Sequence, residues 1–184
     1  MAGASDMTLF TTAPGFDQPL DLLSACHRRI TGLTDMLQKL PSHLAQHGAD
    51  KDAQQAAERV LKYFDTAGVH HHDDEEQDLF PMLRDAALQQ DNAEIIALLE
   101  DLAVQHGDMT IAWLQLHPHL LALVQGESPP SIEPTITRFV TLYARHIPLE
   151  ENFLLPYAER TLSARQIVTL GQAMAKRRNV SYPA

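Results

Sequence analysis

Two stretches of the sequence repeat one pattern, HHDDEEQDLFP over residues 71–81 and HIPLEENFLLP over residues 146–156. In both stretches a histidine precedes a Glu-Glu pair by four residues, and a proline follows the first glutamate by six. Residues four apart lie one above the other on an α-helix, about 6 Å apart, so both side chains can point at one centre. The repeat therefore predicts two helical pairs of metal ligands: His71 with Glu75, and His146 with Glu150.

The rest of the chain has the three- and four-residue spacing of apolar residues that is typical of amphipathic helices. The expected helices span about 17–40, 51–89, 93–125, 131–160 and 164–178. Four long helices with short connections predict an all-α fold, an up-down-up-down four-helix bundle, with the fifth helix as an additional short C-terminal one. We expect a single domain over residues 1–184, with the bundle over about 17–160 and a loose opening segment up to about Gly15.

Several residues have the chemistry of helix ends. Asp17 can cap the first helix, and Pro41 is expected to end or kink it. The Asp91-Asn92 pair can cap the third helix. Ser163 and Gln166 have the spacing of a capping box, which predicts the start of the C-terminal helix.

In each long helix the residues expected to face the core include a histidine, and in two of them also a glutamate. The four stripes are Leu23, His27, Ile30, Thr34, Leu37; His71, Glu75, Leu79, Met82; Ile95, Leu99, Leu102, His106, Met109, Trp113; and Phe139, Leu142, His146, Glu150, Phe153, Tyr157. A buried carboxylate without a partner costs several kcal/mol, and a divalent cation would compensate this cost. The candidate metal ligands are His27, His71, Glu75, His106, His146 and Glu150.

Counting residues places the four histidines at one level of an antiparallel bundle. From His27 to the turn at Gly48 is 21 residues (48 − 27), and from Gly48 to His71 is 23 (71 − 48). Around each of the next two turns, the stretch of chain before the turn and the stretch after it, which leads to His106 or His146, differ in length by up to five residues. Five residues are about 8 Å of helix. Alone, His27 or His106 would more often be a hydrogen-bonded core histidine, but their place opposite the two His-Glu pairs favours ligation.

Some residues near the candidate ligands keep two interpretations open. Glu76 and Glu151 either hold the rings of ligating histidines or face solvent. Asp73-Asp74 is expected to form a solvated face. Three tyrosines are either plain core residues or reach the site: Tyr63, Tyr143 and Tyr157.

Two further neighbours bear on which residues are ligands. His70 and His72 flank His71, so a register shifted by one residue is an alternative, although the spacing to the glutamate favours His71. Cys26 adjoins His27 but points about 100° away around the helix, so we interpret it as a small buried residue and not as a ligand.

The composition excludes several classes of function. A formal net charge of −10 over 184 residues argues against a nucleic-acid-binding protein, because little would neutralise a phosphate backbone. No apolar run approaches the roughly 20 residues that span a bilayer, and the N-terminus lacks the pattern of a secretory signal. One cysteine beside ten histidines suits a reducing compartment and a site built from nitrogen and oxygen ligands. We expect a cytoplasmic protein that binds neither nucleic acid nor membranes.

Over about residues 17–160 the chain resembles the hemerythrin family, specifically the bacterial hemerythrin-like, or HHE cation-binding, domains. The resemblance rests on HRRI at His27, YFD before HHDDEEQDLFP, His106, and RHIPLEENFLLP. It implies a non-haem di-iron centre. In that centre the terminal ligands would be His27, His71, His106 and His146, and the bridging carboxylates would be Glu75 and Glu150.

The sequence departs from the oxygen-carrying hemerythrins at two positions. Thr110 stands where those proteins have a fifth histidine, and Glu150 replaces an aspartate one residue later. The pattern is closer to four-histidine, two-glutamate relatives that are linked to nitric-oxide stress and to the repair of damaged iron centres. Two six-coordinate irons need about twelve bonds, and these ligands supply about eight, which leaves positions for an oxo or hydroxo bridge and small ligands.

The leading functional interpretation is a protein that binds, senses or detoxifies a diatomic gas, O2 or NO, or that takes part in iron handling or iron-centre repair. One alternative is a ferroxidase-like or peroxide-reducing enzyme, and another is a regulatory module that responds to metal or redox state. The ligand set alone would also accept manganese or zinc. A homodimer is compatible with the sequence, and whether the protein is an enzyme is left open.

Overall fold

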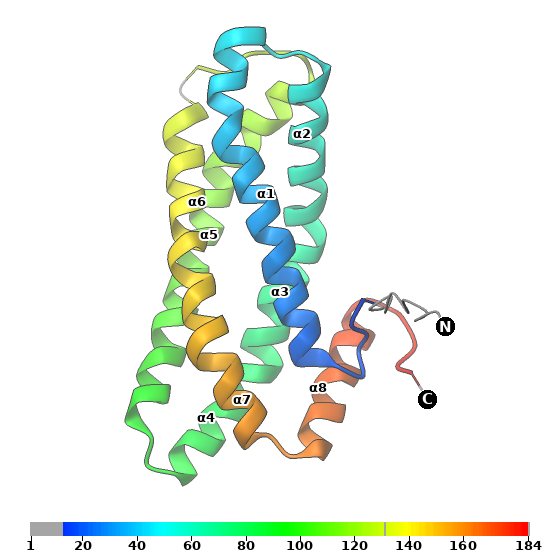
Figure 1. Cartoon of the computed structure of the whole chain (residues 1–184), viewed down its shortest axis with the longest axis vertical. Helices are drawn as coiled ribbons and strands as arrows, with labels where there is room; N and C mark the ends of the chain where they lie inside the picture. Colours follow the sequence, from blue (N-terminus) through cyan, green and yellow to red (C-terminus); the bar gives the residue numbers. More distant parts are fainter. Residues whose placement is uncertain (1–12, 131, 184) are drawn as a thin grey trace, which may run out of the picture.

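The computed structural model describes residues 13–130 and 132–183, and within these ranges every regular element is helical (Figure 1). The first arm of the bundle is α1 (Pro19–His47) and the third is α5 (Ala93–Val124). The second arm consists of α2 (Lys51–Lys62), η1 (Tyr63–Ala67), α3 (Gly68–Asp74), η2 (Glu75–Leu79) and α4 (Phe80–Gln89). The fourth arm consists of α6 (Ile132–Leu149), η3 (Glu150–Leu154) and α7 (Leu155–Thr161), and α8 (Ala164–Arg177) follows it.

The predicted all-α bundle with an additional C-terminal helix is therefore confirmed. The four arms run along the long axis of the molecule, and α8 lies beside one end of it (Figure 1). The predicted loose segment up to Gly15 falls mostly on residues 1–12, which lie outside the described part of the chain. Within the described residues no helix is long and apolar enough to cross a bilayer.

At the ends of α1, the cap predicted at Asp17 and the end predicted near Leu40 are both wrong. Gln18 occupies the N-cap position and makes no capping side-chain hydrogen bond, so Asp17 does not cap the helix. The helix also continues through Pro41 and does not end near Leu40. Leu44 lies in the added turns and packs against the core, so tertiary packing outweighs the backbone hydrogen bond that the proline cannot make.

The caps predicted for two later helices are present. Asn92 accepts a hydrogen bond from the backbone N–H of Ile95 at the start of α5. Ser163 and Gln166 form the reciprocal hydrogen bonds of a capping box at the start of α8. These side chains satisfy backbone N–H groups that have no partner inside the helix.

The apolar core consists of two clusters of buried side chains that are separated by a polar layer. On α1, Leu20 and Leu23 belong to one cluster, Ile30 and Leu37 belong to the other, and His27 lies between them. The other three arms repeat this order, so each presents polar side chains at the level between the clusters. The apolar clusters therefore enclose the polar layer from both ends of the bundle.

Two π-helical turns begin at the glutamates of the repeated motif. η2 starts at Glu75 and η3 starts at Glu150. Pro81 and Pro156 follow these turns, and in an α-helix each ring would clash with the carbonyl of the residue four positions earlier. In each π turn the residue before the proline donates its N–H to the carbonyl of the glutamate, five residues back. This wider turn accommodates the proline, and such turns are frequent at functional sites.

The π turns also shift the buried face of the helices that follow them. Phe153, predicted to face the core, is 58 % exposed, and its neighbour Leu154 is fully buried. In the second arm Leu83 is fully buried, whereas the predicted core residue Met82 is only half-buried. A π turn contains more residues than an α turn, so the residue that faces the core lies one position later.

The prediction of a solvated face at Asp73-Asp74 is wrong for Asp74, which is fully buried. Its carboxylate forms ion pairs with Arg177 and Arg178 at the end of α8. Arg177 also pairs with Asp78, at 2.5 Å. Two cations from α8 therefore compensate a buried anion on α3 and hold the additional helix against the bundle.

Candidate metal centre

All six predicted ligands lie in the polar layer and are almost completely buried, with exposed fractions of 0 to 2 %. The residues are His27 on α1, His71 on α3, Glu75 at the start of η2, His106 on α5, His146 on α6 and Glu150 at the start of η3. Their potential ligand atoms fall into two groups, within each of which the atoms lie no more than 4.8 Å apart. The counting argument for a common level is confirmed.

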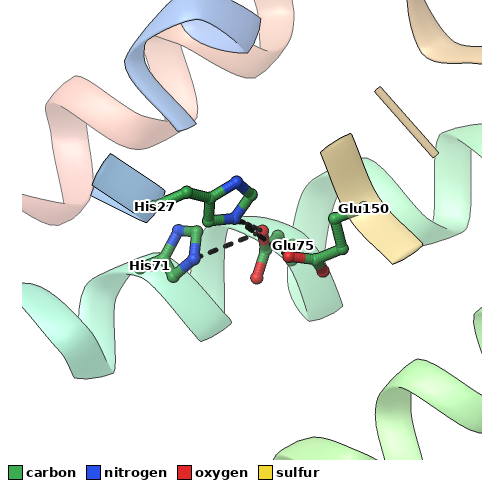
Figure 2. Close-up of side chains that lie close together, drawn as sticks. All are labelled: His27, His71, Glu75 and Glu150. Carbon is green, nitrogen blue, oxygen red and sulfur yellow. Dashed lines mark ion pairs between the residues drawn. The ribbon is translucent and has the colours of Figure 1, made fainter. Parts of the chain in front are cut away.

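The first group consists of His27, His71, Glu75 and Glu150 (Figure 2). Nε2 of His27 lies 2.9 Å from Oε2 of Glu150 and 3.7 Å from Oε1 of Glu75. Nε2 of His71 lies 3.6 Å from the same Glu75 oxygen. Ligands at right angles on an ion with bonds of about 2.1 Å lie about 3 Å apart, so these separations fit an ion placed between the four side chains.

The second group consists of His106, His146 and Glu150. Nε2 of His146 lies 3.1 Å from Oε1 of Glu150, and the Nε2 atoms of His106 and His146 are 3.1 Å apart. Glu75 also approaches this group, since its Oε2 is 3.6 Å from Nε2 of His106. Each glutamate thus directs one oxygen toward each group, which is the arrangement a bridging carboxylate requires.

Three of the four rings are oriented by hydrogen bonds on the side away from the centre. Nδ1 of His27 lies 2.5 Å from Oε1 of Glu151, and Nδ1 of His106 lies 2.7 Å from Oε1 of Glu76. Nδ1 of His146 lies 3.1 Å from the side-chain oxygen of Gln105. A ring N–H that donates outward leaves Nε2 with its lone pair directed at the centre.

The second glutamate of each motif therefore holds a histidine of another helix. Of the two roles left open for Glu76 and Glu151, the structure shows the contact with a histidine. Gln105 was not predicted, because an amide on the half-exposed side of α5 carries no pattern that separates it from a surface residue.

The carboxylates of the centre lack hydrogen-bond partners. Within the described residues, both oxygens of Glu75, both oxygens of Glu150 and Nε2 of His27 are buried and form no hydrogen bond. Buried polar atoms are nearly always hydrogen-bonded, and each exception needs an explanation. One cation in each group would together bind all of these atoms, so the residues present fit a metal centre. That the six residues bind metal stays a prediction.

The centre has unusual proton affinities in the absence of metal. Burial alone would lower the pKa of His27, but the carboxylates of Glu150 and Glu75 outweigh it and raise that pKa to about 11. Burial holds the pKa of His71 well below its usual value. Burial would raise the pKa of Glu150, but the imidazoles of His146 and His27 outweigh it and hold that pKa well below the usual value. A metal ion would therefore compete with a proton for Nε2 of His27.

The three tyrosines are buried but do not form hydrogen bonds with the six ligands. The Tyr63 hydroxyl donates to the carbonyl oxygen of Cys26 at 3.5 Å, and the Tyr157 hydroxyl donates to Gln90 at 3.3 Å. The Tyr143 hydroxyl lies 3.5 Å from Nε2 of His72. Tyr63 and Tyr157 are therefore plain core residues, whereas Tyr143 contacts His72, which itself lies outside the six candidate ligands.

The structure places His71, and neither of its neighbours, in the two groups of potential ligand atoms. The His72 ring stacks on the His106 ring, with centroids 4.0 Å apart, outside both groups. His70 is half-buried and also lies outside them. Thr110 is exposed, and its hydroxyl donates to the carbonyl of His106, so it cannot take the place of a fifth histidine ligand.

We expect Glu151→Ala and Glu76→Ala each to weaken metal binding about 10- to 100-fold, the usual effect of removing a carboxylate that orients a ligating histidine. Glu151→Ala should affect mainly the ion of the first group, because it releases His27, and Glu76→Ala mainly that of the second, because it releases His106. Competition with a chromophoric chelator measures both affinities. The control is Glu58→Ala, at an exposed position on α2, and equal losses in all three variants would contradict the prediction.

Comparisons with known proteins agree with this geometry. Residues 18–158 match the family model described as hemerythrin HHE cation binding domain. The chain is also similar to an uncharacterized protein of Haemophilus influenzae. The two are 33 % identical over 165 residues, which cover 90 % of this chain and 92 % of that protein. The match to the family model includes all six residues of the buried centre.

Proposed function

Since the chain belongs to the hemerythrin HHE cation-binding domain family, we propose that its buried centre holds two iron ions and that these ions bind a diatomic gas, O2 or NO. The observation that supports the proposal is the pair of shared carboxylates. The oxygens of Glu75 and Glu150 lie between two groups of histidines and, within the described residues, have no hydrogen-bond partner. Iron, when bound, supplies reversible redox chemistry and coordination positions for a small ligand.

The number of protein ligands leaves coordination positions free. Four histidines give four bonds and two bridging glutamates give four more, against about twelve for two six-coordinate ions. Each group would thus be completed by two histidines and one oxygen of each glutamate, since Oε2 of Glu75 also lies 3.6 Å from Nε2 of His106. About four positions would remain for a bridging oxygen and a small molecule. An open position is typical of a reactive site, whereas structural sites are closed by protein ligands.

The chain itself contributes orientation, charge and exclusion of water. Glu151 and Glu76 fix the rings of His27 and His106, so that the same nitrogen of each ring faces the centre. The two apolar clusters close the layer at both ends. Buried in this way, the carboxylates attract a cation more strongly than they would in water.

Thr110 supports a ligand other than stored oxygen. In oxygen-carrying hemerythrins a histidine at this position fills one coordination position, and here the side chain faces away from the centre. The more open centre favours NO as the ligand, or a reaction with O2 over its reversible storage. This part of the proposal rests on the departure from the carrier pattern.

The proposal is tested first by metal analysis of protein from cells grown without added metal. We expect about two irons per chain and an optical spectrum that changes on reduction. Protein with one zinc ion per chain and no absorption in the visible range would contradict the proposal.

Titration of the reduced, iron-loaded protein under anaerobic conditions tests the ligand. We expect a stoichiometric change in the optical and paramagnetic resonance spectra with NO, and with O2 a change that is not fully reversed by removing the gas. The His146→Ala variant, which lacks one ligand of the second group, should keep about one iron per chain and show a correspondingly smaller NO response. No spectral change with either gas would refute this function.

A further inference from the structure

Helix α5 is apolar on two faces, only one of which packs against the bundle. Its inner face contributes buried residues to both apolar clusters. Its outer face carries the four largest apolar side chains that the helix exposes: Val104 (64 % exposed), Ile111 (48 %), Leu114 (68 %) and Leu121 (47 %). A helix that is apolar around its circumference is normally buried on all sides, so the outer face indicates a missing partner.

These four residues, together with Gly107 and Pro118, form what we call the outer stripe. Val104, Ile111 and Pro118 follow one another at intervals of seven residues, as do Gly107, Leu114 and Leu121. The two series alternate at intervals of three and four, which is the a/d pattern of a coiled-coil seam. The stripe spans 17 residues (121 − 104), about 26 Å of helix, and therefore fits a second helix that crosses at about 20°.

The order of residues in the outer stripe is symmetric about its midpoint. The numbers of Val104 and Leu121 add up to 225, as do those of Ile111 and Leu114 and those of Gly107 and Pro118. A second α5 that ran antiparallel and was centred between residues 112 and 113 would place each residue opposite its counterpart. Large apolar side chains would then meet each other, and the helices would approach closely where glycine meets proline.

We propose that the outer stripe is the interface of a homodimer in which α5 packs antiparallel against α5 of a second copy. A twofold axis requires a surface that is complementary to itself, and the symmetric order of the stripe meets this requirement. The spacing of any a/d seam is symmetric, but here the four large side chains are also placed symmetrically, at gaps of seven, three and seven residues, so that large side chains meet in a copy of the same chain. Other large apolar side chains on the described surface, such as Leu88 and Phe153, lie on different elements, and scattered exposures of this kind are normal.

The charges beside the stripe are compatible with this register. The acidic residues of one flank, Asp101 and Asp108, would lie opposite Ala122 and Gln115 of the partner subunit. The other flank has no Asp, Glu, Lys or Arg between residues 103 and 124, since it consists of Ala103, Thr110, His117 and Val124. No pair of like charges would therefore face each other across the seam, although each chain carries a net charge of −10.

Sedimentation equilibrium tests the interface. We expect the full-length protein to be a dimer at micromolar concentration. Leu114→Glu should raise the dissociation constant about 30-fold or more, as the loss of a central buried contact does. Ile111→Ser should weaken the dimer without adding charge. The matched control is Leu88→Glu, which places the same charge at a side chain that is 59 % exposed on α4 and should leave the dimer intact.

Disulfide trapping tests the register. In a Cys26→Ala background, mixing Val104→Cys chains with Leu121→Cys chains should give cross-linked heterodimers under mild oxidation. Either variant alone should not cross-link, because the two identical positions would lie about 26 Å apart. A monomer at all concentrations, a dimer that Leu114→Glu does not weaken while circular dichroism shows a folded chain, or cross-linking of Val104→Cys to itself would each overturn the proposal. None of these readouts depends on bound metal.

Discussion

Replacing Glu150 by alanine is expected to abolish stoichiometric binding of both metal ions. Glu150 is the one side chain that belongs to both groups of potential ligands. One of its oxygens lies 2.9 Å from Nε2 of His27, and the other lies 3.1 Å from Nε2 of His146. Removing it takes a ligand and a compensating negative charge from each ion, so we expect both affinities to fall by more than 100-fold, beyond the effect of losing a residue that only orients a ligand.

A comparison of three variants isolates this shared role. His146→Ala removes a ligand of the second group only, and it should lower the metal content from about two ions per chain to about one. Glu159→Ala removes a carboxylate from an exposed position on α7 and should retain both ions. Metal content after dialysis against a weak chelator gives the result directly. If Glu150→Ala kept one ion, as His146→Ala is expected to, the carboxylate would not bridge.

The same variant should change how stability responds to metal. Binding to the folded state stabilises it, so the wild-type protein is expected to melt at a higher temperature with metal than without it. Glu150→Ala should remove most of that difference. A thermal melt of each protein with and without metal separates this effect from a general loss of stability, which would lower both melting temperatures equally.

The layer of the bundle that carries the centre could be predicted because the evidence for it is periodic. The repeated His-x-x-x-Glu-Glu motif fixes one face of two helices, and stretches of chain of similar length on either side of each turn return His27 and His106 to nearly the same level. Both arguments use only the regular rise and turn of an α-helix. The structure accordingly brings all six residues together.

The wrongly predicted core residues lie where the second and fourth arms depart from a regular α-helix. The π turns at Glu75 and Glu150 shift the face that follows by one position, which is why Phe153 faces solvent and Leu154 faces the core. The prolines after each motif were the available signal, since they cannot continue an α-helix without strain. A proline alone, however, does not determine whether a helix ends, kinks or widens, as the uninterrupted helix at Pro41 shows.

Contacts between segments far apart in the sequence were the second source of error. The partners of Asp74 lie more than a hundred residues away on α8. Asp73 and Asp74 are chemically identical, and only the packing of α8 distinguishes the half-buried one from the fully buried one. Glu76 and Glu151 are a second example. Whether each contacts a histidine or faces solvent depends on where the neighbouring helix lies, and the sequence does not give that position.

Removing both arginines that pair with Asp74 is expected to destabilise the protein by about 3–5 kcal/mol, the cost of leaving a buried carboxylate without a partner. The double variant is Arg177→Ala with Arg178→Ala. Both guanidinium groups contact this one carboxylate, and Arg178 does so through two nitrogens, at 2.7 and 3.1 Å. Chemical denaturation followed by circular dichroism measures the loss. A change below about 1 kcal/mol, typical of exposed ion pairs, would show that Asp74 is hydrated and not buried in solution.

Two further variants identify the cause of that loss. Arg165→Ala with Lys176→Ala also removes two positive charges from α8, but at exposed positions, and should cost little. Adding Asp74→Leu to the double arginine variant should restore much of the stability, because an apolar side chain needs no cation at this position. Asp74 directly precedes Glu75, so the metal content of the same proteins reports whether α8 also positions that ligand. If Asp74→Leu restored stability but not metal binding, the arginines would act on the centre through the orientation of η2 as well as through the charge of Asp74.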